Sequence, residues 1–230
     1  MELQQRLRRL GEAAADRVED GMILGLGTGS SADAMLEALG ARVAAGLRIT
    51  GVATSARTRD LAARLGIRLR DIDEIDRLDL GIDGADEIDP DLALVKGRGG
   101  ALLYEKLVAE RCDRYLVIAA SDKLVATLGV RLPLPVEIVP FGATHTVATL
   151  DRIGLHPTLR RDGAGAPVVT DGGHWLADCA TGPIADPAEL ATRIKALTGV
   201  VDHGLFIGLA TSSLTIEETG LLAERHRPLR

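Results

Sequence analysis

Short apolar runs alternate with amphipathic segments along the first 130 residues of the chain. The runs have the length of strands and lie at residues 22–26, 47–53, 67–69, 78–82 and 115–120. Among them, apolar residues recur at helical spacing in residues 3–18, 33–39, 56–65 and 101–111. Strands that alternate with helices predict an α/β fold with a doubly wound, mostly parallel, Rossmann-like sheet.

The regular alternation of strands and helices ends near Pro133. After this residue the pattern predicts a strand at 136–139, a helix at 142–153, an antiparallel pair of strands at 168–170 and 174–179, a helix at 187–197 and a strand from Val200. This β-α-β-β-α-β order is that of a smaller ferredoxin-like α+β domain, predicted over residues 131–205. The apolar segments at 206–210 and 213–216 are expected to return to the first domain, which then comprises residues 1–130 and 206–230.

The chain has 230 residues and a formal net charge of −6, and it contains one Trp, two Tyr and two Phe. Its length allows one large domain or two smaller ones with a real hydrophobic core. The negative charge argues against nucleic-acid partners and anionic membrane surfaces, and the few aromatic side chains argue against stacking on single strands. A phosphorylated small molecule is compatible with this charge, because backbone N–H groups and one or two cations recognise a phosphate locally.

Two cysteines, Cys112 and Cys179, lie far apart and form no Cys-x-x-Cys motif. This usage favours a reducing compartment without a disulfide framework. The first ten residues form a charged helical pattern rather than a signal peptide, and no apolar run is long enough to cross a membrane. The expected location is therefore the cytoplasm.

A glycine-rich turn from Gly25 to Ser31 follows the first long predicted strand and opens the next helix. At such a turn, backbone N–H groups and the positive end of the helix face an anion, and Thr28, Ser30 and Ser31 add hydroxyl donors. The glycine spacing is G-x-G-x-G rather than the G-x-G-x-x-G of dinucleotide-binding proteins, so NAD is not expected. The alternative is a tight strand–helix turn that binds nothing.

Carboxylates and a lysine are interspersed with glycines between residues 83 and 100. Asp83 and Asp86 come at the carboxyl end of a predicted strand, where open α/β sheets bind ligands. Lys96 precedes a glycine-rich run that lets backbone approach a ligand closely, and its ammonium group can neutralise an oxyanion or a phosphate. The alternatives are an ordinary acidic turn and a solvated lysine.

Glu105 lies on the apolar stripe of a predicted helix. Its neighbours three and four residues away are all apolar: Ala101, Leu102, Val108 and Ala109. A carboxylate removed from water is a stronger base, so Glu105 is the predicted proton-transferring group. The alternative is a structural buried ion pair. Lys106, by contrast, has Glu110 four residues on and is predicted to form a surface pair with it.

Lys123, which follows the predicted strand at 115–120, is a second candidate cation. The five histidines show no metal-ligand spacing, so a metal site is not expected. The chain has no G-x-S-x-G elbow, which leaves a serine hydrolase without support.

Several of these motifs together resemble ribose-5-phosphate isomerase of type A. The resemblance rests on Gly27-Thr28-Gly29-Ser30-Ser31, Thr54-Ser55, Asp83-Gly84-Ala85-Asp86-Glu87, Lys96-Gly97-Arg98-Gly99-Gly100-Ala101 with Glu105-Lys106, and Leu132-Pro133-Leu134-Pro135-Val136-Glu137. It runs in order along most of the chain, and the spacing of the two central motifs is highly specific. Arg98 stands where some members have glycine, and Tyr104 where many have arginine.

The resemblance implies an aldose–ketose isomerase that interconverts D-ribose 5-phosphate and D-ribulose 5-phosphate through an enediolate, in the non-oxidative pentose phosphate pathway. It implies no metal or cofactor, two domains, and a homodimer or homotetramer. The implied catalytic residues are Glu105 as base, Lys96 at the oxyanion, and Asp83 and Asp86, one of which assists ring opening. The expected substrate contacts are Thr28, Gly29, Ser30, Ser31, Ser55, Asp83, Gly84, Ala85, Asp86, Lys96, Gly97, Arg98, Gly99 and Lys123.

Two other functions are compatible with an α/β architecture of this kind. A non-catalytic sugar-phosphate sensor would need a DNA-binding module, and no helix-turn-helix precedes the first long strand. A CoA transferase with a glutamate nucleophile would need a site for adenine and pantetheine, for which the chain is short.

Overall fold

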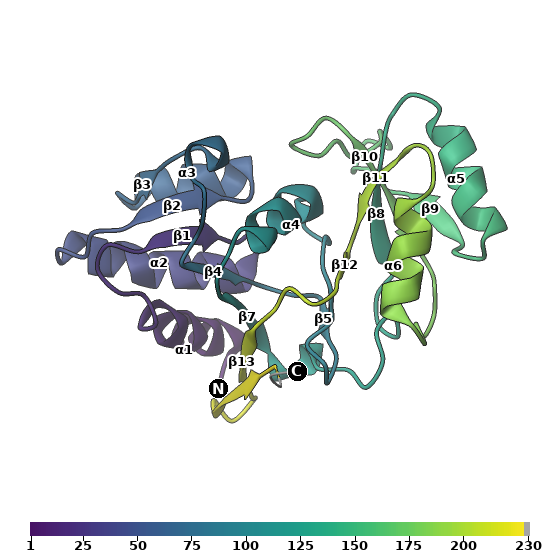
Figure 1. The fold of residues 1–230 in the computed structure, drawn as a ribbon. Helices are drawn as coiled ribbons and strands as arrows, with labels where there is room; N and C mark the ends of the chain where they lie inside the picture. The colour runs from purple at the N-terminus through teal and green to yellow at the C-terminus, as the bar shows by residue number, and fades with distance from the viewer. Residues whose placement is uncertain (228–230) are drawn as a thin grey trace. The chain divides into compact units, whose positions relative to one another are not determined.

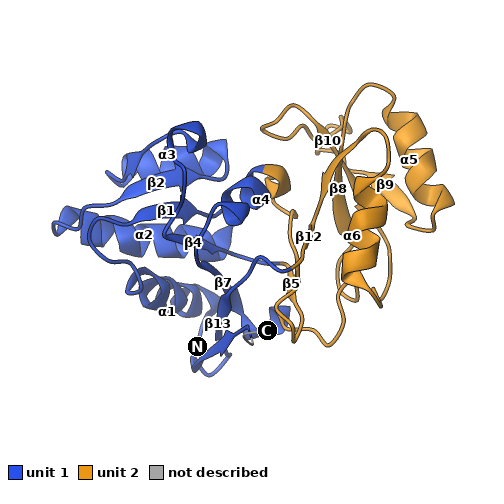
Figure 2. Ribbon diagram, viewed as in Figure 1, with its two compact units in different colours: residues 1–85, 104–123, 208–230 blue, residues 86–103, 124–207 orange. Residues whose placement is uncertain are grey.

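The computed structural model describes residues 1–227, and the chain divides into two compact units (Figure 2). The first unit comprises residues 1–85, 104–123 and the chain from residue 208 onward. The second comprises residues 86–103 and 124–207. Residues 86–103 therefore group with the second unit, whereas the division predicted from the sequence assigns them to the first.

A seven-stranded sheet forms the centre of the first unit (Figure 1), with the order β14-β13-β7-β4-β1-β2-β3. Neighbouring strands are parallel except for β14, which pairs antiparallel with β13. The strands are β1 (Ile23–Leu26), β2 (Thr50–Ala53), β3 (Arg68–Leu69), β4 (Leu80–Asp83), β7 (Tyr115–Ala120), β13 (Ser212–Ile216) and β14 (Leu222–His226). This mostly parallel sheet confirms the predicted α/β class.

Helices cover both faces of this sheet. They are α1 (Leu3–Ala15), α2 (Ser30–Ala44), α3 (Ala56–Arg64) and α4 (Leu102–Glu110), with short 3₁₀ turns η1 (Ile72–Glu74) and η2 (Ser121–Lys123). Leu24 and Leu26 of β1 point to a core shared with α1, α2 and α3. Ile23 of the same strand packs in a different cluster with Val108 of α4. Because side chains alternate across a strand, α4 lies on the opposite face from the other three helices.

The second unit contains a four-stranded antiparallel sheet with the order β11-β8-β10-β9. Its elements are β8 (Leu134–Ile138), α5 (Ala143–Arg152), β9 (Pro157–Leu159), β10 (Trp175–Cys179), α6 (Pro187–Lys195) and β11 (Val200–His203). They follow the predicted β-α-β-β-α-β order. A small sheet of β5 (Glu87–Ile88), β6 (Leu94–Val95) and β12 (Leu205–Phe206) completes this unit.

Two strand predictions in this region are wrong. Residues 168–170 contribute only an isolated bridge between Val169 and Trp175, and β10 pairs instead with β9. Val169 is 61% exposed, so burial of its side chain does not help to hold this segment in the sheet. Phe206 does not return to the first unit, because it pairs with Leu94 in the small sheet. The return of residues 213–216 to the large sheet is confirmed by β13.

The helix predicted at residues 33–39 is longer in the structure, because α2 continues through Gly40 to Ala44. A Cβ at Gly40 would lie 2.8 Å from the Cβ of Leu65, just beyond the end of α3. The glycine therefore allows close packing of α2 against Leu65 rather than a chain reversal. None of the helices within residues 1–227 has both the length and the apolar character that a membrane crossing requires.

Candidate active site

The order of the strands in the large sheet reverses between β1 and β4. Thr28 follows β1, and Asp83 ends β4. The Thr28 N–H donates to Oδ1 of Asp83 at 3.1 Å, and the Gly84 N–H donates to the same oxygen at 2.7 Å. The structure thus brings three predicted site residues together at the carboxyl ends of the strands, where open α/β sheets bind ligands.

A cluster of hydroxyl groups holds the Thr28 side chain. Its Oγ1 lies 2.8 Å from Oγ1 of Thr54, 2.8 Å from Oγ of Ser55 and 2.9 Å from Oγ1 of Thr58. Ser55 also caps α3, because its hydroxyl accepts the Thr58 N–H at 3.0 Å. The hydroxyls of Thr28 and Ser55, both expected to contact substrate, are therefore also structural. Thr58 was not predicted to belong to this cluster. The only feature of the sequence that points to it is its position three residues after the Ser55 cap.

The N-terminus of α2 has the form of an anion site. Gly29 is its N-cap with φ of 120°, and no side chain within residues 1–227 caps the helix. The first-turn N–H groups at Ser30 and Ser31 are therefore available to a ligand. Lys123 ends η2 just after β7 and is half-buried, and it forms no ion pair within the described part of the chain.

The buried side chain of Tyr115 lies beside Asp83. Its hydroxyl donates to Oδ2 of Asp83 at 3.2 Å. Burial raises the pKa of Tyr115 well above its ordinary value, and the negative charges of Asp83 and Glu105 raise it further. The two carboxylates therefore lie near the same buried phenol, which stays protonated and able to donate a hydrogen bond.

Glu105 is only 3% exposed, as the apolar positions around it predict. Its helical neighbours Ala101, Leu102, Val108 and Ala109 are all buried. The predicted surface position of Lys106 is wrong, because this residue is also buried. The reason is that α4 is covered around most of its circumference and exposes only Leu107 and Glu110.

The second unit carries the remaining predicted residues, in a loop that leads from β6 to α4. Lys96 is 3% exposed, and its ammonium group lies 5.5 Å from the centre of the Phe206 ring. The Arg98 N–H donates to Oδ2 of Asp86 at 3.0 Å, which ties the predicted acid to the predicted loop. The Arg98 residue is exposed, in line with a contribution from its backbone rather than its side chain.

Glu87, the last residue of the acidic motif, has a structural role. It is fully buried and accepts backbone N–H groups from Gly129 at 2.6 Å, Arg131 at 2.7 Å and Leu132 at 3.2 Å. Such hydrogen bonds satisfy a buried carboxylate and fix the segment that leads into β8. The motif therefore combines the two acids predicted for the site with a third acid that stabilises the fold.

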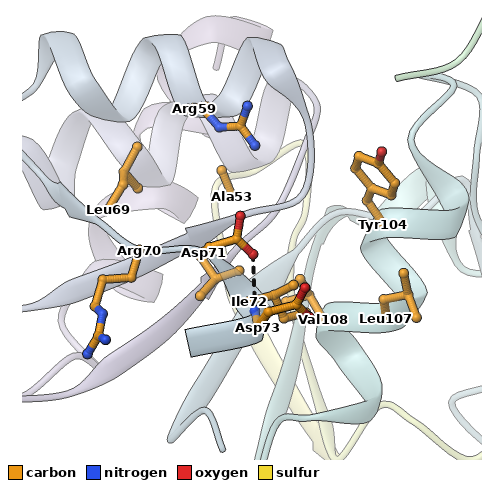
Figure 3. A pocket seen from close by; sticks show the side chains of 11 residues that line it. Ala53, Arg59, Leu69, Arg70, Asp71, Ile72, Asp73, Tyr104, Leu107 and Val108 are labelled. Carbon is orange, nitrogen blue, oxygen red and sulfur yellow. Dashed lines mark hydrogen bonds between the residues drawn. The ribbon is translucent and has the colours of Figure 1, made fainter. Parts of the chain in front are cut away.

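A pocket of about 340 Å³ lies within the first unit beside α4 (Figure 3). Arg59 and Tyr104 project over it, and Asp71 accepts the Asp73 N–H at its floor. Its wall is formed by Val52, Ala53, Arg59, Leu69, Arg70, Asp71, Ile72, Asp73, Tyr104, Leu107 and Val108. None of these is a predicted site residue, although Tyr104 and Val108 belong to the helix that carries Glu105.

Metal-binding side chains do not cluster in the structure. Among residues 1–227, no three His, Cys, Asp or Glu side chains come together in a group that could hold a metal ion.

Both thiols are expected to resist alkylation in the folded protein. Burial raises the pKa of Cys112 and of Cys179 from 9.0 to about 12, with a smaller contribution from Asp83 at Cys112 and from Asp178 at Cys179. The thiolate is the reactive form, so its fraction at pH 8 falls about a thousandfold. Iodoacetamide labelling followed by mass spectrometry measures this, with the urea-unfolded chain as control. Labelling of the native protein at the unfolded rate would contradict the expectation.

Comparisons with known proteins agree over nearly the whole chain. Residues 50–220 match the family model of ribose 5-phosphate isomerase A (phosphoriboisomerase A). A relative from Thermomicrobium roseum named Ribose-5-phosphate isomerase A is 53% identical over 221 residues, which cover 95% of this chain and 93% of the relative. The solved ribose 5-phosphate isomerase from Plasmodium falciparum is 34% identical with a TM-score of 0.95, covering 99% of this chain and 100% of that one.

A second solved structure, a D-ribose-5-phosphate isomerase in complex with phospho-erythronic acid, is 31% identical with a TM-score of 0.95. It covers 99% of this chain and 100% of that chain. Fold and relatives together define an aldose–ketose isomerase that acts on a sugar phosphate. The chain belongs to the ribose-5-phosphate isomerase A family, which is an enzyme family of the pentose phosphate pathway. The interpretation as a non-catalytic sensor is not favoured.

Proposed function

We propose that the chain interconverts D-ribose 5-phosphate and D-ribulose 5-phosphate through an enediolate, with Glu105 as the single base. The observation that supports this most is the buried carboxylate of Glu105 on a helix of the first unit, near the same phenol as Asp83. Isomerisation moves one proton between C2 and C1, so one carboxylate serves both transfers. Exclusion of water from Glu105 keeps the abstracted proton from exchanging with solvent.

The loop of the second unit supplies electrostatic stabilisation in this proposal. The Lys96 ammonium group and the nearby backbone N–H groups of Gly97 and Gly99 stabilise the negative charge that develops on oxygen, whereas the Arg98 N–H donates to Asp86 and keeps the loop in place. Asp83, Gly84, Ala85 and Asp86 hold the sugar hydroxyls, and one of the two aspartates assists the opening of the furanose ring. Phospho-erythronic acid, the ligand of a structural relative, has a carboxylate that resembles the enediolate and is a suitable probe for this chain.

The phosphate binds, in the same proposal, at the N-terminus of α2. Gly29, Ser30 and Ser31 offer first-turn N–H groups and hydroxyls, and Thr28 and Ser55 complete the site. Lys123 provides the positive charge, since it is half-buried at the end of η2 and forms no ion pair within the described residues. Helix N-termini with such donors bind anions.

Lys123→Ala is expected to lower kcat/KM for ribose 5-phosphate by about 10- to 150-fold, mostly through KM. The reason is the loss of one charged hydrogen bond, worth roughly 1.5–3 kcal/mol. Steady-state kinetics with ribose 5-phosphate and with unphosphorylated ribose measures the effect. An equal loss for both sugars would assign Lys123 to the reacting carbons or to the fold instead.

A coupled assay with ribose 5-phosphate, run before and after exhaustive dialysis against EDTA, tests the reaction itself. Turnover is expected in both samples, because none of the proposed steps needs a metal ion. A lack of activity in both samples would refute the proposed reaction. Activity that disappears with EDTA and returns with a divalent ion would refute the metal-free mechanism.

The cellular setting forms part of the proposal. The enzyme works in the cytoplasm, in the non-oxidative branch of the pentose phosphate pathway, without a nucleic-acid partner. Its sparse cysteines and net charge of −6 support this setting. A homodimer or homotetramer is the expected assembly, and light scattering would measure it.

A further inference from the structure

An ion pair of the second unit reaches the loop that carries Lys96. Arg160 follows β9, and its Nε donates to Oδ2 of Asp178 on β10 at 2.8 Å, while its Nη2 donates to Oδ1. The side chains of the two residues are 17% and 27% exposed. A planar guanidinium held at two points by a carboxylate has a fixed orientation.

The third nitrogen of this guanidinium, Nη1, points at the backbone of the loop. Nη1 of Arg160 lies 3.2 Å from the carbonyl oxygen of Gly97 and 2.9 Å from that of Arg98. The loop is otherwise held by the Lys96 N–H, which donates to the Gly204 carbonyl at 2.8 Å, and by the contact of Arg98 with Asp86 described above. Of these bonds, only the one from Arg160 reaches the Arg98 carbonyl.

That carbonyl belongs to a peptide that can adopt two orientations. Residues 97–100 form a β-turn, in which the Gly100 N–H donates to the Gly97 carbonyl at 3.0 Å. Type I and type II turns share this bond and differ in the orientation of the central peptide, here Arg98–Gly99. Type II needs positive φ at Gly99, which glycine adopts at little cost. Gly97 and Gly100 have positive φ, of 104° and 84°, but Gly99 does not, so the turn is not of type II.

We propose that the Arg160–Asp178 pair is a positioning device for the reaction. It holds the Arg98–Gly99 peptide in one of its two orientations, so that the Gly99 N–H faces the developing oxyanion. Since the peptide is planar and trans, a carbonyl turned toward Arg160 directs the Gly99 N–H to the opposite side. This N–H has no acceptor within residues 1–227. The inference rests on the proposed role of the Lys96 loop.

Arg160→Met is expected to lower kcat by about 10- to 100-fold with a change in KM of less than about threefold. If the Gly99 N–H turns away from the oxyanion, the transition state loses a hydrogen bond, whereas binding of the substrate changes little. Affinity for phospho-erythronic acid should fall in parallel with kcat, whereas inhibition by inorganic phosphate should not change. Arg161→Met is the matched control, because the only hydrogen bond of the Arg161 side chain within residues 1–227 goes to the carbonyl of Gly165, in an exposed hairpin.

Arg160→Lys and Asp178→Asn keep the test informative if Arg160→Met does not fold. A single ammonium group cannot span the carboxylate and both carbonyls, so Arg160→Lys should also lower kcat selectively. A folded Arg160 variant with wild-type kcat would overturn the proposal, as would equal losses of affinity for phospho-erythronic acid and phosphate. Lys96→Met distinguishes a failure of the proposed function of the loop from a failure of the positioning role. If it retains wild-type kcat, the proposed function of the loop fails; if only Lys96→Met loses kcat, the positioning role alone fails.

Discussion

Replacing Glu105 with glutamine is expected to lower kcat by about 10²- to 10⁴-fold, the usual cost of losing a general base. Glutamine has nearly the same shape, so the surrounding apolar side chains of α4 keep their packing. It cannot accept the proton from C2 or return it to C1. Steady-state kinetics with ribose 5-phosphate measures the loss, and a thermal shift induced by phospho-erythronic acid reports whether the ligand still binds.

Glu110→Gln is the matched control for this experiment. Glu110 lies on the same helix and is exposed, so the same chemical change is made without touching the buried cluster. Its kcat should equal that of the unaltered enzyme. A Glu105→Gln variant that keeps more than about a tenth of the original kcat would remove Glu105 from the role of base.

Most of the parallel strands were predictable because they coincide with apolar runs of strand length. Tyr115–Ala120, for example, is buried at all six positions and has no polar alternation. The short antiparallel strands were not predictable. β5, β6 and β12 have two residues each, and β9 has three with only partial burial. Segments of this length carry no period, and long-range pairing alone determines them.

The predicted site depended on two different kinds of signal. Glu105 was recognisable as a buried carboxylate from helical spacing. The residues three and four positions away are apolar, which places Glu105 on the buried side of its helix. Asp83 was recognisable from its place at a strand end. The backbone contacts of Glu87 and Arg160 were not recognisable, because the backbone partners lie more than 40 residues away in the chain. Charged residues of this kind look like ordinary surface residues until the fold brings their backbone partners to them.

Gly27→Ala is expected to damage both stability and turnover, since Gly27, which follows β1, packs directly against Asp83. A Cβ at this position would lie 2.4 Å from Cγ and from Oδ1 of Asp83, and 2.5 Å from its Cα. Asp83 would have to move, and the N–H groups of Thr28 and Gly84 would lose their acceptor. Overpacking of this kind costs about 1–3 kcal/mol of unfolding free energy. Displacement of the acid by about 1 Å can cost on the order of 10²-fold in kcat.

Urea unfolding and steady-state kinetics measure the two effects separately, at a temperature where the variant stays folded. Gly163→Ala is the control, because no atom lies within 4 Å of a Cβ built there and its φ is not positive. That variant should keep its kcat and its unfolding free energy to within about 0.5 kcal/mol. If Gly27→Ala lost stability but kept kcat, Asp83 would have adjusted without consequence for the reaction, and its proposed contact with the sugar would be wrong. The fall in kcat is expected because Asp83 is buried and its Oδ1 accepts two backbone N–H groups, which leaves it no alternative position.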